Sequence, residues 1–142
     1  MKKFLFGFLR AYMRANSVIS GSNQRKLDEK ISRALEAWIV DKKYCIPNQT
    51  IQDVADELDV SAEAFSYYCT TVLGERFGSF RKKLRIEEAK RIIEEEPECK
   101  MVNVAFRVGI HDKCNFRRQF FEICGCPPSE WKKRCLRKKK ES

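Results

Sequence analysis

Residues 51–60, IQDVADELDV, recur fifty positions later as residues 101–110, MVNVAFRVGI. In both stretches apolar residues occupy the first, fourth, fifth, eighth and tenth positions, and the fifth is alanine in each. Spacings of three and four residues are typical of one face of an α-helix. The repetition therefore predicts two copies of one helical motif.

The similarity continues after one inserted residue in the second copy. At an offset of 51, four pairs correspond: Phe65 with Phe116, Cys69 with Phe120, Leu73 with Cys124, and Gly74 with Gly125. Thr50, Ser61 and Asp112 stand where helix N-caps are expected, and the two glycines are expected to end helices. Two short helices joined by a tight turn form a helix-turn-helix motif. We therefore predict such motifs at residues 50–74 and 101–125.

Further helical patterns flank the two motifs. Apolar residues from Leu27 to Ile39 predict a helix with Lys42 and Lys43 in its last turn. Residues 79–96 predict one longer helix that Pro97 ends. A last helix is expected to open at residues 127–129. Strand patterns are nearly absent, so we predict an all-α fold in which a central linker helix joins the two motifs.

The length of the linker helix suits a tandem DNA reader. Eighteen residues at ~1.5 Å each span about 27 Å, and successive major grooves lie roughly 34 Å apart. Recognition helices at about 61–73 and 112–124 could then enter adjacent major grooves from one monomer.

Charge is distributed unevenly along the 142 residues. The net charge is +9, with +6 in residues 1–49, −5 in residues 50–98 and +8 in residues 99–142. A localised basic region indicates a surface for a polyanion. The alternative is a solvated basic surface, including a basic tail predicted at residues 136–142.

Several classes of function are disfavoured by composition. Seven cysteines without a Cys-x-x-Cys pair, and a single His, argue against a disulfide framework, a metal site, a cofactor or an enzyme. Free cysteines are expected to be small buried hydrophobes, with a redox-sensing thiol at Cys114 or Cys135 as the alternative. No apolar run is long enough to span a membrane, and we predict a cytoplasmic protein.

Three blocks of sequence support a family resemblance. They are Thr50-Ile51-x-x-Val54-Ala55-x-x-Leu58-x-Val60-Ser61, then Leu73-Gly74 with Phe80 and residues 84–92, then Val104-Ala105-x-x-Val108-Gly109 with Phe116, Phe120 and residues 125–131. Over about residues 27–135, the chain resembles the DNA-binding domain of AraC/XylS-type transcriptional regulators. The resemblance implies about seven helices and sequence-specific transcriptional regulation through double-stranded DNA.

The second recognition helix has side chains suited to base edges. Arg binds guanine, and Asn or Gln binds adenine, through paired hydrogen bonds. The residues that match the family's groove-facing positions are Lys113, Asn115, Arg117 and Arg118. The first recognition helix offers Glu63, Ser66 and Tyr67 but no Lys or Arg. We therefore expect the second motif to dominate DNA affinity.

Other polar residues receive separate roles. Lys82, Lys132, Lys133 and the basic tail are the predicted phosphate contacts. Arg85 is expected to form a structural ion pair with the neighbouring Glu87 and Glu88, and His111 to hydrogen-bond the backbone or a phosphate.

The resemblance also has departures. Asp59 stands where the family usually has Gly, Cys69 where it usually has a core Phe, and Ile110 where it usually has Phe. The chain has no room for the separate sensor domain that many members possess. It therefore resembles either the small stand-alone members or a fragment of a longer regulator with an upstream sensor domain. RNA polymerase is a further expected partner.

The N-terminal segment and the acidic first motif leave alternatives open. Residues 1–26 have a basic amphipathic pattern followed by a polar linker from Asn16 to Lys26. We favour a helix packed on the domain, or a remnant of another domain, over a membrane-surface anchor or a partner-binding helix. The acidic first motif allows a second function, that of a protein-interaction module that does not itself bind DNA.

Overall fold

The computed structural model describes residues 21–141, and in this range the chain has seven α-helices and no strand, as the sequence predicted. The helices are α2 (Ser22–Val40), α3 (Ile51–Glu57), α4 (Ala62–Tyr68), α5 (Phe77–Glu95), α6 (Met101–Arg107), α7 (Lys113–Cys124) and α8 (Pro128–Glu141). A short 3₁₀ turn, η1 (Lys43–Cys45), follows α2, and a π-helical turn, η2 (Cys69–Leu73), continues α4.

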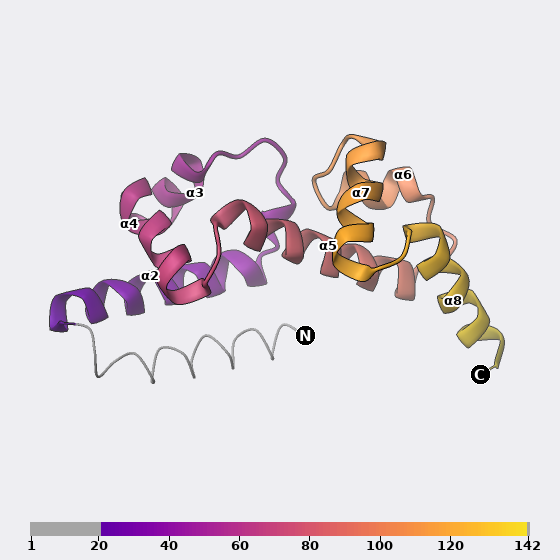
Figure 1. Ribbon diagram of the computed structural model, residues 1–142, viewed down its shortest axis with the longest axis horizontal. Coiled ribbons are helices and arrows are strands. Elements are labelled where there is room, and N and C mark those ends of the chain that lie inside the picture. Colours follow the sequence, from indigo (N-terminus) through magenta and orange to yellow (C-terminus); the bar gives the residue numbers. More distant parts are fainter. Residues whose placement is uncertain (1–20, 142) are drawn as a thin grey trace. The chain divides into compact units, whose positions relative to one another are not determined.

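The described chain divides into two compact units. The first unit contains residues 21–43 and 49–80, and the second contains residues 44–48 and 81–141. Figure 1 shows α2, α3 and α4 with the start of α5 in the first unit, and α6, α7 and α8 with the rest of α5 in the second. Helix α5 therefore belongs to both units along its length.

The first unit is held together by an aromatic and aliphatic core. The Phe77 ring lies 5.1 Å from that of Phe65 and 5.8 Å from that of Trp38, measured between centroids. The hydroxyl groups of Ser32 and Tyr68 form a hydrogen bond of 2.5 Å that links α2 to α4. These contacts fix the recognition helix of the first motif to α2 and to the start of α5.

The second unit has a separate core. Its fully buried members come from α5, α6 and α7: Ile86, Ala89, Ile93, Val104, Val108 and Phe120. From α8, Cys135 joins the same core. The Lys90 ammonium of α5 lies 4.6 Å from the Trp131 ring centroid, a cation–π contact that also holds α8.

The helix caps agree with the sequence. Thr50 forms a capping box with Asp53, and the side chains of Ser61 and Asp112 accept hydrogen bonds from the third backbone N–H of their helices. Gly74 and Gly125 end their helices in the left-handed conformation, with φ of 76° and 74°. These predictions are confirmed. Each cap depends on residues only a few positions apart, so the local sequence was enough to predict it.

Several predicted helix limits were wrong. Helix α2 begins at Ser22, so residues 22–26 are helical and not a linker; Gln24 bonds Asp28 one turn on, and Arg25 bonds Glu29. Helix α2 also ends at Val40, before Lys42 and Lys43. The rest of the predicted N-terminal amphipathic segment and linker lies outside the described residues.

The other differences concern the ends of the longer helices. Helix α5 begins at Phe77, because that buried ring is part of the first core. The predicted basic tail is helical through Glu141, and the Lys139 ammonium donates to the Glu95 carbonyl at 3.4 Å. No helix in the described range is long and apolar enough to cross a membrane.

Candidate nucleic-acid interface

The turn of the second motif is set by backbone hydrogen bonds between α6 and the residues that follow it. The Ile110 N–H donates to the Ala105 carbonyl at 2.9 Å, and the Gly109 N–H donates to the Phe106 carbonyl at 3.1 Å. Gly109 has φ of 84°. Asp112 then caps α7 by accepting from the Asn115 N–H at 2.7 Å. The start of α7 is therefore held in a defined orientation on α6.

The first motif repeats this turn at the same positions. The Val60 N–H donates to the Ala55 carbonyl at 3.1 Å, and the Asp59 N–H donates to the Asp56 carbonyl at 3.1 Å. Asp59 has φ of 58°, so it adopts the left-handed conformation of its counterpart Gly109. Asp tolerates this conformation better than most residues. The Lys30 ammonium also donates to the Asp59 carbonyl at 2.9 Å.

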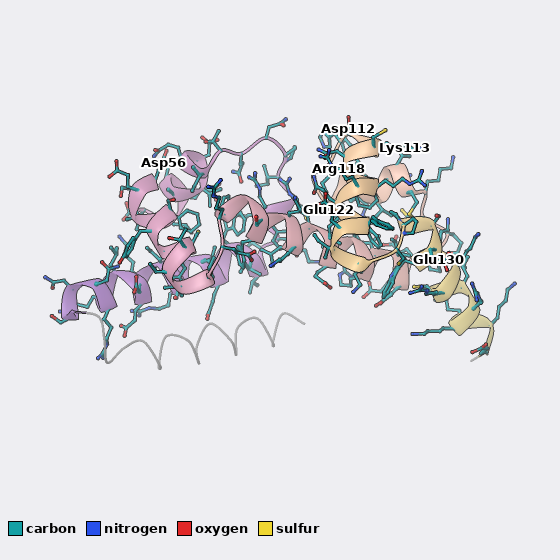
Figure 2. The ribbon with its side chains drawn as sticks, in the orientation of Figure 1. Asp56, Asp112, Lys113, Arg118, Glu122 and Glu130 are labelled. Atoms are coloured by element: carbon teal, nitrogen blue, oxygen red, sulfur yellow. The ribbon has the colours of Figure 1, made fainter. Side chains whose placement is uncertain are left out.

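Helix α7 separates an apolar face from a basic one. Phe116 and Phe120 are buried in the second core, while Lys113, Arg117 and Arg118 are exposed. Figure 2 shows Lys113 at the N-terminal end of the helix and Arg118 further along it. Recognition helices place their N-terminal residues against base edges. The basic side chains of α7 therefore lie in the half of the helix suited to base contact.

The four predicted base-contacting residues of α7 fall into two groups. The Arg118 guanidinium donates to the side-chain oxygen of Asn115, which is half-buried. Among residues 21–141, Lys113 and Arg117 have no described hydrogen bond or ion pair from their side chains. Arg117 can therefore present its full donor fork to a base, whereas Asn115 and Arg118 must exchange their mutual bond for one.

The predicted residues of the first recognition helix, Glu63, Ser66 and Tyr67, are all exposed. Tyr67 is 57% exposed. The turn η2 begins directly beyond this face, where the Thr70 and Thr71 hydroxyls donate to the Tyr67 carbonyl at 3.1 and 2.7 Å. The last part of the expected recognition helix is thus a π turn, which the sequence did not predict.

The first motif has five acidic residues and no basic one between residues 50 and 74. Two of the acids are matched by lysines from outside the motif. Glu57 contacts the Lys43 ammonium at 3.1 Å and accepts from the Gln49 amide at 2.8 Å, and Asp59 lies 3.4 Å from the Lys30 ammonium. The hydrogen bonds from Gln49 and Lys43 lower the pKa of Glu57. These lysines reduce the negative charge that a phosphate backbone would meet.

The predicted phosphate-contacting lysines have different surroundings. Lys82 is half-buried on α5, with its ammonium 3.6 Å from a carboxylate oxygen of Glu122 on α7. Lys132 is half-buried and Lys133 exposed on α8. Lys82 must therefore give up Glu122 to bind a phosphate, whereas Lys133 is already presented to solvent.

Arg85 does not form the predicted ion pair with Glu87 or Glu88. Its guanidinium donates to the Tyr44 carbonyl at 2.6 Å and to the Ile46 carbonyl at 2.9 Å. Burial, with a further contribution from Arg81, lowers the pKa of Arg85 to about 10. Arg85 thus holds residues 44–48 against α5. These partners lie about 40 residues from Arg85 in the chain, so local sequence could not predict the contact.

The two glutamates pair elsewhere on α5. Glu88 accepts from the Arg91 guanidinium, with distances of 3.1 and 3.0 Å to the Arg91 Nε atom, and Glu87 lies 3.7 Å from the Lys90 ammonium. Glu88 is 5% exposed, so its pairing with Arg91 satisfies a buried charge.

The cysteines differ from one another in exposure. Cys135 is buried, and burial raises its pKa, so it does not fit the redox-sensing alternative. Cys114 is exposed on α7. Burial raises the pKa of Cys69 to about 12 and that of Cys124 to about 11. Within residues 21–141, no group of three or more His, Cys, Asp or Glu could hold a metal ion.

One exposed apolar patch was not predicted. Val102 and Phe106 lie one turn apart on α6 and are 54% and 65% exposed. The His111 ring stacks on Phe106 at 4.5 Å, with an interplanar angle of 9°. The corresponding residues of the first motif are Gln52 and Asp56, which hydrogen-bond each other at 2.8 Å.

His111 is the one residue inserted in the second copy of the repeat. The apolar patch of Val102, Phe106 and His111 is therefore specific to the second motif and is not required by the motif's fold. The patch could have been found from sequence, by asking at which positions the first copy has a polar residue and the second copy an apolar one.

Comparison with known proteins gives consistent matches. A family model described as a helix-turn-helix domain matches residues 54–134, which is more than half of the chain. No curated protein sequence matches significantly. Among solved structures, the C-terminal domain of AraT, a response regulator from Geobacillus stearothermophilus, is 25% identical, with a TM-score of 0.66 over 73% of this chain and 84% of that one.

Two further structures share the fold. The C-terminal domain of the two-component response regulator yesN from Fusobacterium nucleatum is 23% identical, with a TM-score of 0.63 over 71% of this chain and 97% of that one. A DNA-binding transcriptional dual regulator from Escherichia coli K-12 is 16% identical, with a TM-score of 0.63 over 84% and 96%.

Proposed function

This chain belongs to the helix-turn-helix family of AraC type, and from that premise we propose that it recognises a specific double-stranded DNA site with both of its motifs. It is a DNA-binding regulator of transcription and not an enzyme, as the sequence predicted. The DNA-binding function also supports the predicted cytoplasmic location.

The proposal assigns base recognition chiefly to α7. Its supporting observation is the exposed basic face in the N-terminal half of that helix, behind the Asp112 cap. Arg117 and Lys113 are free to donate to guanine O6 and N7. Asn115 and Arg118 form the second pair of contacts. On DNA, their mutual hydrogen bond would be replaced by hydrogen bonds to an adenine or to a phosphate.

The first motif contributes less to affinity in this proposal. Glu63 can accept from the amino group of cytosine, and Ser66 and Tyr67 can donate or accept at a base edge or phosphate. With no Lys or Arg between residues 50 and 74, the motif gains little from counterion release. Its role is sequence preference, with Lys30 and Lys43 limiting the repulsion from its acids.

Phosphate contacts come from Lys82, Lys132 and Lys133. Each phosphate contact adds about 0.9 to the magnitude of the slope of log K against log salt. Helix α5 has 19 residues and is therefore about 28 Å long at ~1.5 Å per residue, which supports recognition of two adjacent major grooves.

Selection of bound duplexes from a random library at physiological salt tests this function. We expect two enriched sequence blocks about one helical turn apart, in an asymmetric site. A single block would restrict recognition to one motif. Absence of enrichment, together with binding that only weakens with salt, would overturn sequence recognition and favour the protein-interaction module that the acidic first motif allows.

The predicted contact with RNA polymerase has a candidate surface in the apolar patch of Val102, Phe106 and His111. Exposed apolar patches on regulators are typical of protein contacts, and the first motif shows that the fold itself does not need this one. In the chain, the patch lies just before the recognition helix α7.

The variant V102Q/F106Q tests the polymerase contact, because Gln occupies position 52 of the first motif without disturbing it. We expect DNA affinity within twofold of the unsubstituted chain and loss of most regulation in transcription with purified RNA polymerase. Full regulation by the variant would exclude this surface. A parallel loss of DNA affinity would also exclude it, since the patch would then act through DNA.

A further inference from the structure

The outer face of α8 is a stripe of cations. Lys133, Arg137 and Lys140 are spaced by four and three residues, which places them on one side of the helix. All three are exposed, whereas Cys135 on the opposite side is buried in the second core. Among residues 21–141, no described ion pair involves any of these three cations.

The sequence repeat shows that this stripe is not a requirement of the fold. At the offset of 51, Trp131 corresponds to Phe80, so α8 is the counterpart of the first part of α5. Arg137 and Lys140 then correspond to Ile86 and Ala89, both of which are 0% exposed in the second core. At these two positions the second copy therefore has solvent-exposed cations, whereas the first copy has buried apolar residues.

The helix that carries the stripe also makes three contacts within the second unit. Trp131 packs under Lys90, Cys135 is in the core, and the Lys139 ammonium donates to the carbonyl at the end of α5. From Lys133 to Lys140 the helix rises by about 10 Å. Phosphates advance by about 3.4 Å per nucleotide along one DNA strand, so three cations can follow a short run of backbone.

The chemistry of α8 favours nucleic acid over a lipid surface. A helix that lies in a membrane interface inserts an apolar face opposite its cations. Two apolar residues of α8 are instead packed within the second unit: Trp131 contacts Lys90, and Cys135 is buried. The neighbouring Arg134 lies 3.9 Å from Glu130 and is the partly neutralised edge of the stripe.

We propose that the stripe of Lys133, Arg137 and Lys140 binds backbone phosphates of the duplex that flanks the site recognised by the second motif. This contact extends the DNA footprint on one side without adding base specificity. It rests on the proposed DNA-binding function and goes beyond it, because it gives the second motif a contact outside the base-recognition site. Helix α2 of the first unit also has exposed cations at the same spacing, Lys26, Lys30 and Arg33. Two of them are already engaged, because Lys30 pairs with Asp59 and Arg33 donates to the Glu29 carbonyl.

The test compares the full chain with R137Q/K140Q, which leaves Lys133 in place. Gln has a helix propensity similar to those of Lys and Arg, so α8 should be retained, and circular dichroism checks this. The control variant R25Q/K26Q removes the same charge from exposed positions of α2. Dissociation constants are measured on duplexes lengthened by ten base pairs on one side or the other of the selected site, from 50 to 300 mM salt.

We expect lengthening on the second motif's side to raise the affinity of the unsubstituted chain several-fold, and lengthening on the other side to have little effect. R137Q/K140Q should lose that gain, reduce the salt slope by about two, and weaken binding at 0.15 M roughly 10- to 30-fold. Sequence preference should stay the same. The control should keep the length dependence.

Two results would overturn the stripe contact: an unchanged salt slope in R137Q/K140Q, or an equal reduction in R25Q/K26Q, which would reflect net charge alone. Failure of the proposed function is distinguishable. If the unsubstituted chain shows no sequence preference while R137Q/K140Q still reduces the salt slope, the stripe remains a DNA contact and sequence recognition fails.

Discussion

Gly109 lies directly against the backbone of Cys45: a Cβ atom at position 109 would stand 2.4 Å from the Cys45 carbonyl oxygen. The same region contains the Arg85 guanidinium, which donates to the carbonyls of Tyr44 and Ile46 on either side of Cys45. The turn that orients the second recognition helix is therefore packed on residues 44–48, far away in sequence. Glycine is needed at position 109 for space as well as for its positive φ.

Gly109→Ala should be among the most destabilising substitutions in the chain. Left-handed strain costs about 1–2 kcal/mol, and overpacking against a backbone carbonyl adds roughly 1–3 kcal/mol. Gly125→Ala is the matched control, because Gly125 has φ of 74° but open space around it. In urea denaturation, the free energy of unfolding of the control should decrease only by the cost of the left-handed backbone strain. Equal losses in the two variants would mean that Cys45 moves away at little cost.

Asp59 provides the complementary test in the first motif. We expect Asp59→Gly to be more stable than Asp59→Ala by about 1 kcal/mol, because only glycine adopts φ near 58° without strain. Both variants lose the exposed side-chain contact with Lys30 and keep its hydrogen bond to the backbone carbonyl. Their difference in urea unfolding therefore isolates the backbone conformation. An alanine variant as stable as the glycine variant would contradict it.

Arg117→Ala should weaken binding to the selected DNA site by about 1–3 kcal/mol, or roughly 5- to 150-fold, and relax preference at one base pair. Tyr67→Ala should cost clearly less, because the first motif contributes no cation. Fluorescence anisotropy titrations on matched and single-mismatch duplexes measure both effects. Comparable losses from the two substitutions would disprove the unequal division between the motifs.

Stability should fall as pH rises above 9, in part through Cys69. Burial raises the pKa of this thiol from about 9 to about 12, so the folded state keeps a proton that the unfolded state loses between these values. The unfolded state then binds fewer protons, and the free energy of unfolding decreases by up to ~1.4 kcal/mol per pH unit.

Urea unfolding between pH 8 and pH 10, with reductant, measures this decrease. The variant Cys69→Val retains an apolar side chain at the site and should have a shallower pH dependence over the same range. The upper limit avoids most of the titration of Tyr68, whose pKa burial raises to about 12. Identical pH dependence in the two proteins would rule out Cys69 as a source of the decrease.

Local sequence predicted those features that depend on neighbouring residues. The capping side chains of Thr50, Ser61 and Asp112, and the left-handed glycines 74 and 125, each act within one helical turn. The apolar spacing of α7 likewise placed Phe116 and Phe120 inside, and so left Lys113, Arg117 and Arg118 outside. The exposed basic face of the second motif could therefore be predicted before any coordinates.

Contacts between distant residues were not predicted in this way. Arg85 has glutamates nearby in sequence, but its guanidinium donates instead to the carbonyls of Tyr44 and Ile46. The reason is that Arg85 lies beside residues 44–48, where backbone oxygens are the available acceptors. Helix α8 continues through the expected tail because Cys135 and Lys139 contact the second unit.

The sequence by itself determined the two helix-turn-helix motifs, their caps and the face of α7 that is exposed, because periodicity and capping are properties of chain segments a few residues long. Only the tertiary structure decided that Gly109 must lie against Cys45, and that Arg137 and Lys140 are exposed to solvent whereas Ile86 and Ala89 are buried. The physical reason is that burial depends on which surfaces meet, and residues that meet are often far apart along the chain.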